Sequence, residues 1–103
     1  MKRALDPNEA MKALAHPMRL EFLAWLKQPA HHFVLRTAEK GIGVPAGQFE
    51  RSGLSQSAVS QHLSVLYRAG LVTTQRIGSQ VLYTRDEGNI DQLKSWLAER
   101  VWN

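Results

Sequence analysis

A run of uncharged polar side chains between positions 56 and 64 is the most chemically distinctive feature of this sequence. Hydroxyls and amides recur there at the spacing of one helical face, which consists of Gln56, Ser57, Ser60, Gln61, Ser64 and Arg68. An ordinary solvated face carries Glu and Lys, whereas this one carries no acid. Such groups both donate and accept hydrogen bonds, as contact with base edges in a DNA major groove requires. A neutral surface helix is the alternative interpretation.

A helix with clear ends must position these side chains. Ser55 can cap its first turn, because the hydroxyl accepts from an amide that lacks a partner within the helix. Gly70 stands where a left-handed residue commonly ends a helix. The opposite face is apolar and follows helical spacing through Val59, Leu63, Leu66 and Gly70. The two faces therefore separate into one for the core and one for a partner.

A second helix and a hairpin are predicted on either side of this helix. A short helix over 46–52, anchored by Phe49, and a turn at Gly53 make residues 46–70 a helix-turn-helix. Residues 72–85 alternate as two strands around Gly78-Ser79, which fits a type II′ turn. The predicted register places four side chains on one face, namely Val72, Thr74, Val81 and Tyr83. The predicted fold class is mostly α (α+β), a winged helix-turn-helix with a two-stranded β wing and terminal dimerisation helices.

Positive charge is concentrated in the same part of the chain. The 103 residues carry a net charge of +4, and residues 51–85 contain four arginines and no acid. The remaining residues balance nine Lys and Arg against nine Asp and Glu. A local basic patch favours phosphate, so Arg51, Arg68, Arg76 and Arg85 are candidate phosphate contacts. The predicted DNA-binding residues are Arg51, Ser55, Gln56, Ser57, Ser60, Gln61, Ser64, Arg68, Arg76, Ser79 and Gln80.

Amphipathic helices are predicted at both ends of the chain. Asp6-Pro7 starts a helix over 5–15, and Asn89 is expected to cap a helix over 89–102. Together they carry more apolar surface than one small core can cover, which predicts a two-fold dimer. The predicted interface residues are Met11, Leu14, Ile90, Leu93, Trp96, Leu97 and Val101, with Trp102 beside them.

The helix between His16-Pro17 and Pro29 is expected to be central to the core. Leu20, Leu23 and Ala24 form its predicted stripe, and three larger side chains widen it, namely Phe22, Trp25 and Leu26. Core packing is the favoured role of Trp25 over ligand stacking. Residues 31–47 then form a long loop or short hairpin, whose role is either structural or to shape an effector pocket.

Length and composition indicate a single domain and argue against disulfide-bonded and membrane-spanning proteins. The length suits one domain over 1–103, and without cysteine neither disulfides nor thiolate metal sites are possible. The longest apolar run is far too short for a membrane span, and no export signal is visible, so we expect a cytoplasmic protein. His31 and His32 are adjacent rather than at ligand spacing, so no metal or other cofactor is predicted.

The segments ALAHPMRLEFLAWL, LSQSAVSQHLSVLYRAGLV and QRIGSQVLYTRD together resemble the ArsR/SmtB-type bacterial repressors. The resemblance implies a homodimer that binds a palindromic operator in double-stranded DNA and represses transcription until an effector binds. It assigns base and phosphate contacts to Gln56, Ser57, Ser60 and Gln61. His62 is interpreted as a packing or backbone-contact residue rather than a base reader. The family's cysteine and C-terminal histidine metal ligands are missing here, so a thiolate-bound metal is not the expected effector.

An enzyme and a protein-binding module are the two alternatives to a DNA-binding protein. An enzyme could use Ser60 or Ser64 with His62, but no acid between 51 and 85 could orient the base, so no catalytic residue is predicted. A protein-binding module could use the Trp-rich terminal helix, although it would not need the polar face. The sequence identifies neither the operator, the target genes nor the effector. The direction of the effector's action and the role of residues 28–45 also stay open.

Overall fold

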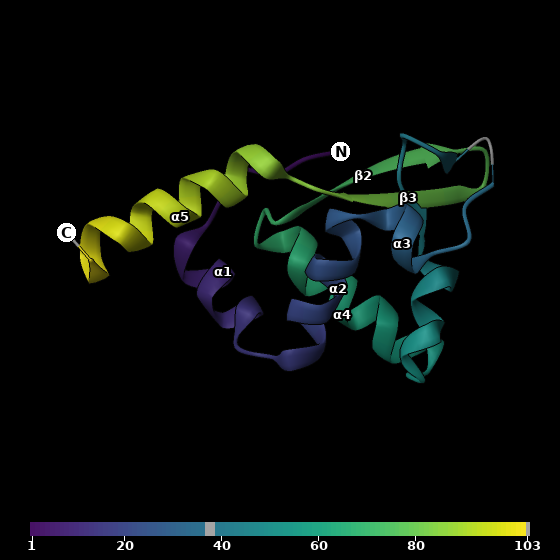
Figure 1. Cartoon of the computed structure of the whole chain (residues 1–103), viewed down its shortest axis with the longest axis horizontal. Helices are drawn as coiled ribbons and strands as arrows, with labels where there is room; N and C mark the ends of the chain where they lie inside the picture. Colours follow the sequence, from purple (N-terminus) through teal and green to yellow (C-terminus); the bar gives the residue numbers. More distant parts are fainter. Residues whose placement is uncertain (37–38, 103) are drawn as a thin grey trace.

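The computed structural model describes residues 1–36 and 39–102. The helices are α1 (Pro7–Leu14), α2 (Pro17–Lys27), α3 (Pro29–His32), the 3-10 helix η2 (Ala46–Ser52), α4 (Gln56–Arg68) and α5 (Glu87–Val101). The strands β1 (Val44–Pro45), β2 (Val72–Ile77) and β3 (Gln80–Arg85) form one antiparallel sheet in the order β1-β3-β2. Most helices lie below this sheet in Figure 1, and α5 leads away from it. The predicted fold class, mostly α with a β wing, is confirmed.

Two proline-started helices open the chain. The Asp6 carboxylate accepts from the Glu9 amide at 3.2 Å, so the predicted cap of α1 is confirmed. His16 caps α2 in the same way, because its Nδ1 accepts from the Met18 amide at 3.1 Å. The break between the two helices therefore falls at His16-Pro17, as proline's restriction on its preceding residue predicts.

The core lies between α2, η2, α4 and the base of the wing. Its largest fully buried side chains are Phe22, Phe49, Leu63, Leu66, Leu71 and Leu82. Trp25 packs at the edge of the core, with its ring 5.6 Å from that of Phe22, in agreement with the predicted packing role. The predicted stripe on α2 is partly wrong, because Leu20 and Ala24 are exposed while Leu23 is buried. Phe22 and Leu26 are buried in its place, since α2 turns this wider side toward η2 and α4.

The hairpin has the predicted turn and register. Val72 pairs with Arg85, Thr74 with Tyr83, and Ile77 with Gln80. Gly78 has φ +59°, and no non-glycine residue of the described chain has positive φ, which fits type II′ rather than I′.

A third strand was not predicted. Val44 and Pro45 pair with Tyr83 and Leu82 on the other side of β3, so the sheet is wider than the expected two-stranded wing. Two residues are too short for a periodic sequence signal. The segment 28–45 is thus partly strand, and its residues 37 and 38 lie outside the described part of the chain.

The start of the last helix corrects the predicted start. Asp86, rather than Asn89, is the N-cap of α5, and its Oδ1 accepts from the Asn89 amide at 2.9 Å. The Asn89 side chain instead donates to the carbonyls of Arg3 and Gly70, at 2.8 and 2.9 Å. Both residues are good caps, and the tertiary position of Asp86 after β3 decides between them. None of the helices in the described residues is long and apolar enough to cross a membrane.

Candidate nucleic-acid interface

Helix α4 is held firmly at both ends. The Ser55 hydroxyl accepts from the Ala58 amide at 3.1 Å, as predicted. At the other end, Gly70 has φ +82° and donates to the Tyr67 carbonyl at 3.0 Å, while Leu71 donates to that of Leu66 at 3.0 Å. These two bonds form a Schellman motif, which satisfies the last carbonyls of the helix. The first and last turns of α4 therefore both have hydrogen bonds that define where the helix begins and ends.

The two faces of α4 separate as the spacing predicted. Val59, Leu63 and Leu66 are buried. The polar face, defined as Gln56, Ser57, Ser60, Gln61, Ser64 and Arg68, is exposed throughout. Within residues 1–36 and 39–102, no hydrogen bond or ion pair found in the structure engages these six side chains. Their donors and acceptors are free for an external partner, and Ser55 lies exposed at the same end as Gln56.

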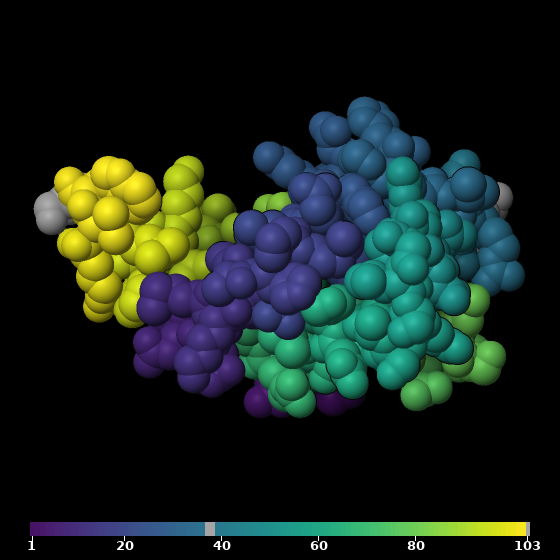
Figure 2. All heavy atoms as spheres, turned by 90° about the horizontal axis from the view of Figure 1, so that it is seen from below, coloured from purple at the N-terminus to yellow at the C-terminus, as the bar shows by residue number. Residues whose placement is uncertain are grey.

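A short helix and a tight turn precede α4. Phe49 of η2 is completely buried, with its ring 4.8 Å from Phe22, which confirms the predicted anchor. Gly53 has φ +84° and donates to the Glu50 carbonyl at 3.0 Å, so the chain reverses between η2 and α4. In Figure 2 the atoms of η2 and α4 (teal) form one continuous surface, and the wing (green) emerges at its edge.

The arginines of the basic segment have different environments. Arg51, Arg68 and Arg76 are all exposed. The guanidinium of Arg51 also lies 5.0 Å from the centre of the Trp25 ring. Arg85 is bound within the chain, because its Nε is 2.8 Å from Glu87 Oε2 and its Nη1 donates to the Leu23 carbonyl at 3.2 Å. The structure therefore does not support the prediction that Arg85 contacts phosphate.

At the wing tip, Ser79 and Arg76 are exposed and Gln80 is half-buried. Gln80 accepts a hydrogen bond on Oε1 from Arg36 Nη2 at 2.8 Å. Sequence reasoning missed Arg36, because it lies 44 residues from Gln80 in a segment without periodicity. No local pattern in the sequence signals this contact.

His62 is a packing residue, as interpreted from the sequence. Its ring lies 4.5 Å from that of His16 and 6.0 Å from that of Phe22, and its Nδ1 is 3.3 Å from Arg19 Nη1. Burial, followed by the charges of His16 and Arg19, lowers the pKa of His62 below 6.5. The neutral imidazole is therefore favoured between α2 and α4.

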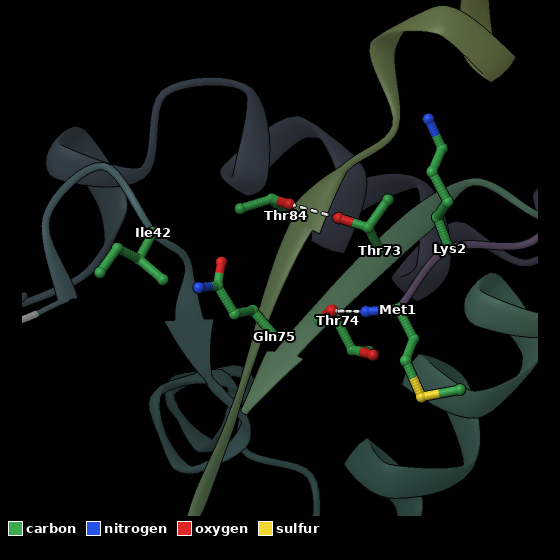
Figure 3. Close-up of a pocket in the computed structure, with 7 residues that line it drawn as sticks. All are labelled: Met1, Lys2, Ile42, Thr73, Thr74, Gln75 and Thr84. Carbon is green, nitrogen blue, oxygen red and sulfur yellow. Dashed lines mark hydrogen bonds between the residues drawn. The ribbon is translucent and has the colours of Figure 1, made fainter. Parts of the chain in front are cut away.

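The first residues of the chain lie beside β2, where they line a shallow hollow. Figure 3 shows the Met1 nitrogen donating to the Thr74 carbonyl, and the Thr74 amide donates back to the Met1 carbonyl at 2.8 Å. The Thr73 and Thr84 hydroxyls, 2.7 Å apart, join the two strands across the wing. The backbone of Met1 therefore covers part of the free edge of β2.

The predicted interface residues divide by exposure. Met11 and Val101 are exposed, and so is Trp102, at 74%. Trp96 is half-buried beneath the Arg100 guanidinium, 4.2 Å from its ring centre, and Leu14, Ile90 and Leu97 are also half-buried. Leu93 is buried in the chain's own core, so little of its side chain is left to contact a second copy. Figure 2 shows the end of α5 (yellow) projecting from the body beside α1 (purple).

The described residues contain no group of three or more His, Cys, Asp and Glu close enough to hold a metal ion. The candidate site is a surface made by the polar face of α4 and the wing tip, and it carries exposed hydrogen-bonding and cationic groups.

The chain is similar to known bacterial transcriptional regulators. The sequence model described as "Bacterial regulatory protein, arsR family" matches residues 50–74, which contain α4. The uncharacterized HTH-type transcriptional regulator YbzH of Bacillus subtilis is 38% identical over 94% of this chain and 100% of its own. The biofilm growth-associated repressor of Xylella fastidiosa (strain Temecula1) is 32% identical over 89% of this chain and 70% of its own.

A solved structure of a related regulator has a similar fold. HlyU from Vibrio cholerae superposes with a TM-score of 0.60 at 29% identity, covering 92% of this chain and 90% of that one. HlyU is described as a transcriptional activator. The relatives of this chain therefore include both a repressor and an activator.

Proposed function

This chain belongs to the ArsR family of bacterial transcriptional regulators, and from that membership we propose that it is a homodimeric repressor of a palindromic operator. The family's members bind DNA and are not enzymes, which excludes catalysis by Ser60 or Ser64 with His62. The observation that carries the proposal is the polar face of α4, exposed and free of internal bonds, in a segment whose charge is entirely positive.

In the proposed complex, α4 enters the major groove with its N-terminal end foremost. Gln56, Ser57, Ser60 and Gln61 read base edges, because amides and hydroxyls can match the donor and acceptor pattern of a base pair. Ser55 and Ser64 extend this contact to sugar and phosphate. Apart from Ser55, whose hydroxyl accepts from the Ala58 amide, none of these side chains must first break an internal bond found in the described residues, which lowers the cost of binding.

The cations position the protein on the duplex. Arg68 at the end of α4 and Arg76 in the wing contact phosphate, and Arg51 does so from its place on the Trp25 ring. Ser79 and Gln80 at the wing tip lie along the backbone or reach the adjacent minor groove. These contacts hold any DNA sequence, so they supply affinity rather than discrimination.

Two copies are proposed to pair through α1 and α5. The projecting end of α5 exposes Val101 and Trp102, and α1 beside it exposes Met11. Exposed apolar side chains that adjoin one another favour an isologous contact. The pair places its two α4 helices about one DNA turn apart, roughly 34 Å, in successive major grooves.

Repression follows from occupation of a promoter, without chemistry by the protein. The relative described as a repressor supports this direction, and an effector that favours the unbound form would lift it. Because the sequence has no cysteine, we propose an effector other than a thiolate-bound metal. A regulator of this kind works where the chromosome lies, in the cytoplasm.

Selection from a random duplex library tests the proposed function. The chain is incubated with duplexes that carry a randomised stretch, and the bound fraction is sequenced over several rounds. We expect enrichment of an inverted repeat with half-sites about one helical turn apart. A bound fraction with no enriched sequence would contradict the proposal and favour the protein-binding alternative.

A further inference from the structure

Residues 33–36 and 39–45 contact both the helix-turn-helix and the wing, and the first of these contacts is with η2. The side chain of Gln48 brackets the backbone of Val34, since its Nε2 donates to the Val34 carbonyl at 2.8 Å and its Oε1 accepts from the Val34 amide at 3.4 Å. Gln48 belongs to η2, which packs against α4. One end of the segment is therefore fixed to the helix-turn-helix.

An ion pair between the exposed Arg36 and the buried Glu39 is the next contact of this segment. Glu39 is only 3% exposed, and its carboxylate binds Arg36 through three hydrogen bonds. Oε1 accepts from the Arg36 amide at 2.9 Å, and Oε2 accepts from Nε and Nη2 at 3.0 and 2.9 Å. The backbone amide of Arg36 is the main cause that lowers the pKa of Glu39, against the opposing effect of burial, so the carboxylate is charged at neutral pH.

The same guanidinium reaches the wing. Arg36 Nη2, already held by Glu39, also donates to Gln80 Oε1 at 2.8 Å. Gln80 is the first residue after the Gly78-Ser79 turn. Below the tip, Val44 and Pro45 pair with β3, so the last two residues of the segment also contact the wing.

We propose that Arg36 is a positioning residue, which, fixed by Glu39, sets the place of the wing tip relative to α4. The inference rests on the proposed function in that a positioned wing matters for operator binding. A planar guanidinium suits this role, because its fork binds the carboxylate and the amide at once, whereas the compact ammonium of lysine lacks that geometry. Arg36 is therefore a connection between two DNA-facing elements rather than simply one more cation.

The charge of Glu39 allows a test in which positioning and simple electrostatics predict opposite signs. Glu39→Gln raises the net charge by one, so electrostatics alone would strengthen binding to every DNA. If Glu39 holds Arg36 in place, loss of their ion pair would instead weaken operator binding. Arg36→Ala removes the contact itself, and Lys40→Ala, an exposed residue of the same segment, is the control that removes the same charge.

The first measurement uses the free protein. The heteronuclear ¹⁵N NOE of the Gly78, Ser79 and Gln80 amides reports their mobility on the ps–ns timescale. We expect Glu39→Gln and Arg36→Ala to lower these values while core amides keep wild-type shifts, and Lys40→Ala to leave them unchanged. Wing-tip values that equal wild type in both Glu39→Gln and Arg36→Ala would overturn the inference.

The second measurement compares binding of the selected operator and of random DNA. Glu39→Gln should weaken operator binding about three- to tenfold, the net effect of about one ordinary hydrogen bond, and leave random DNA as tightly bound or tighter. Operator binding by Glu39→Gln as tight as wild type would overturn the inference. If the wild-type chain selects no operator, the proposed function fails, and the NOE still decides whether Arg36 sets the wing tip.

Discussion

Amide and hydroxyl side chains on α4 have a different task from the arginines that flank them. A base edge presents a pattern that only matched donors and acceptors can read, whereas phosphate attracts any nearby cation. Gln61 is exposed at the middle of the polar face, and Arg76 is exposed in the wing. The two residues therefore offer a direct comparison between discrimination and general affinity.

Gln61→Ala and Arg76→Ala should differ in both sequence preference and salt dependence. Loss of Gln61 is expected to weaken operator binding by about 1–3 kcal/mol and to leave the salt slope unchanged, because no phosphate contact is lost. Loss of Arg76 should weaken binding to all DNA and reduce the slope of log K against log salt by about one. Fluorescence anisotropy across a salt series measures both. Equal losses on operator and random DNA for both variants would contradict the division of labour.

His62 makes the junction between α2 and α4 sensitive to pH. Burial, His16 and Arg19 disfavour its protonated form in the folded chain, so the unfolded chain takes up this proton at higher pH. The unfolding free energy contributed by neutral His62 is fully present above pH 6.5 and is lost as pH falls from there through the folded pKa. We therefore expect acidification to lower the free energy of unfolding of the chain.

Urea unfolding at about pH 7.5 and about pH 5.5 measures this effect. Wild type is expected to lose stability between the two, and His62→Gln, which cannot titrate, should lose less over the same interval. His31→Gln is the matched control, because His31 is exposed and outside this junction. The same pH dependence in wild type and His62→Gln would show that another group controls the loss.

The two ends of α4 could be predicted from the sequence, whereas the segment that packs against Gly70 could not. Ser55 and Gly70 act on residues within one helical turn, so the residues that form each cap are close together in the sequence. The crossing of the N-terminal segment over Gly70 has no such signature. A Cβ at Gly70 would lie 2.7 Å from the Ala4 carbonyl oxygen, a contact between residues far apart in the chain.

Gly70→Ala should therefore destabilise the chain more than Gly53→Ala. Both glycines have positive φ, and alanine in that region costs about 1–2 kcal/mol. Only Gly70 adds a backbone clash, because nothing lies within 4 Å of a Cβ at Gly53. Denaturant unfolding of the two variants gives the comparison. Equal losses would mean that the segment before α1 moves aside freely.

The same reasoning explains which other predictions succeeded. The hairpin turn, the Asp6 cap and the apolar face of α4 depend on local chemistry, and the structure confirms them. The two-residue strand β1 depends on β3, which follows it by more than thirty residues in the sequence. The partners of Arg85 and the start of α5 at Glu87 likewise follow from tertiary contacts, which periodicity does not report. Sequence alone thus placed the polar face correctly and missed the support of the wing.

At the scale of the whole molecule, the projecting end of α5 determines how two copies could meet. Val101 is 62% exposed, so its replacement should leave the fold of one copy intact. Trp96 is less suitable for such a test, since it is half-buried and packs on the core of its own chain.

Val101→Asp should weaken dimerisation at least about tenfold, because a carboxylate placed in an apolar contact must lose its hydration. Gln92→Glu adds the same charge at an exposed position on another side of α5 and is the control. Sedimentation at micromolar concentration gives the dimer fraction of each. A wild-type chain that is monomeric there, or a Val101→Asp variant that dimerises normally, would contradict the proposed interface.

The central claim is that two copies of α4 read two half-sites on one side of a duplex, and the spacing of those half-sites tests it most directly. Insertion of roughly 5 bp between them turns the second half-site to the opposite side of the helix while both sequences stay intact. The measurement is the affinity of the wild-type chain for the selected operator and for this insertion. We predict a loss of at least about a hundredfold on the insertion, toward the affinity for random DNA. Equal affinity for the two duplexes would contradict the account.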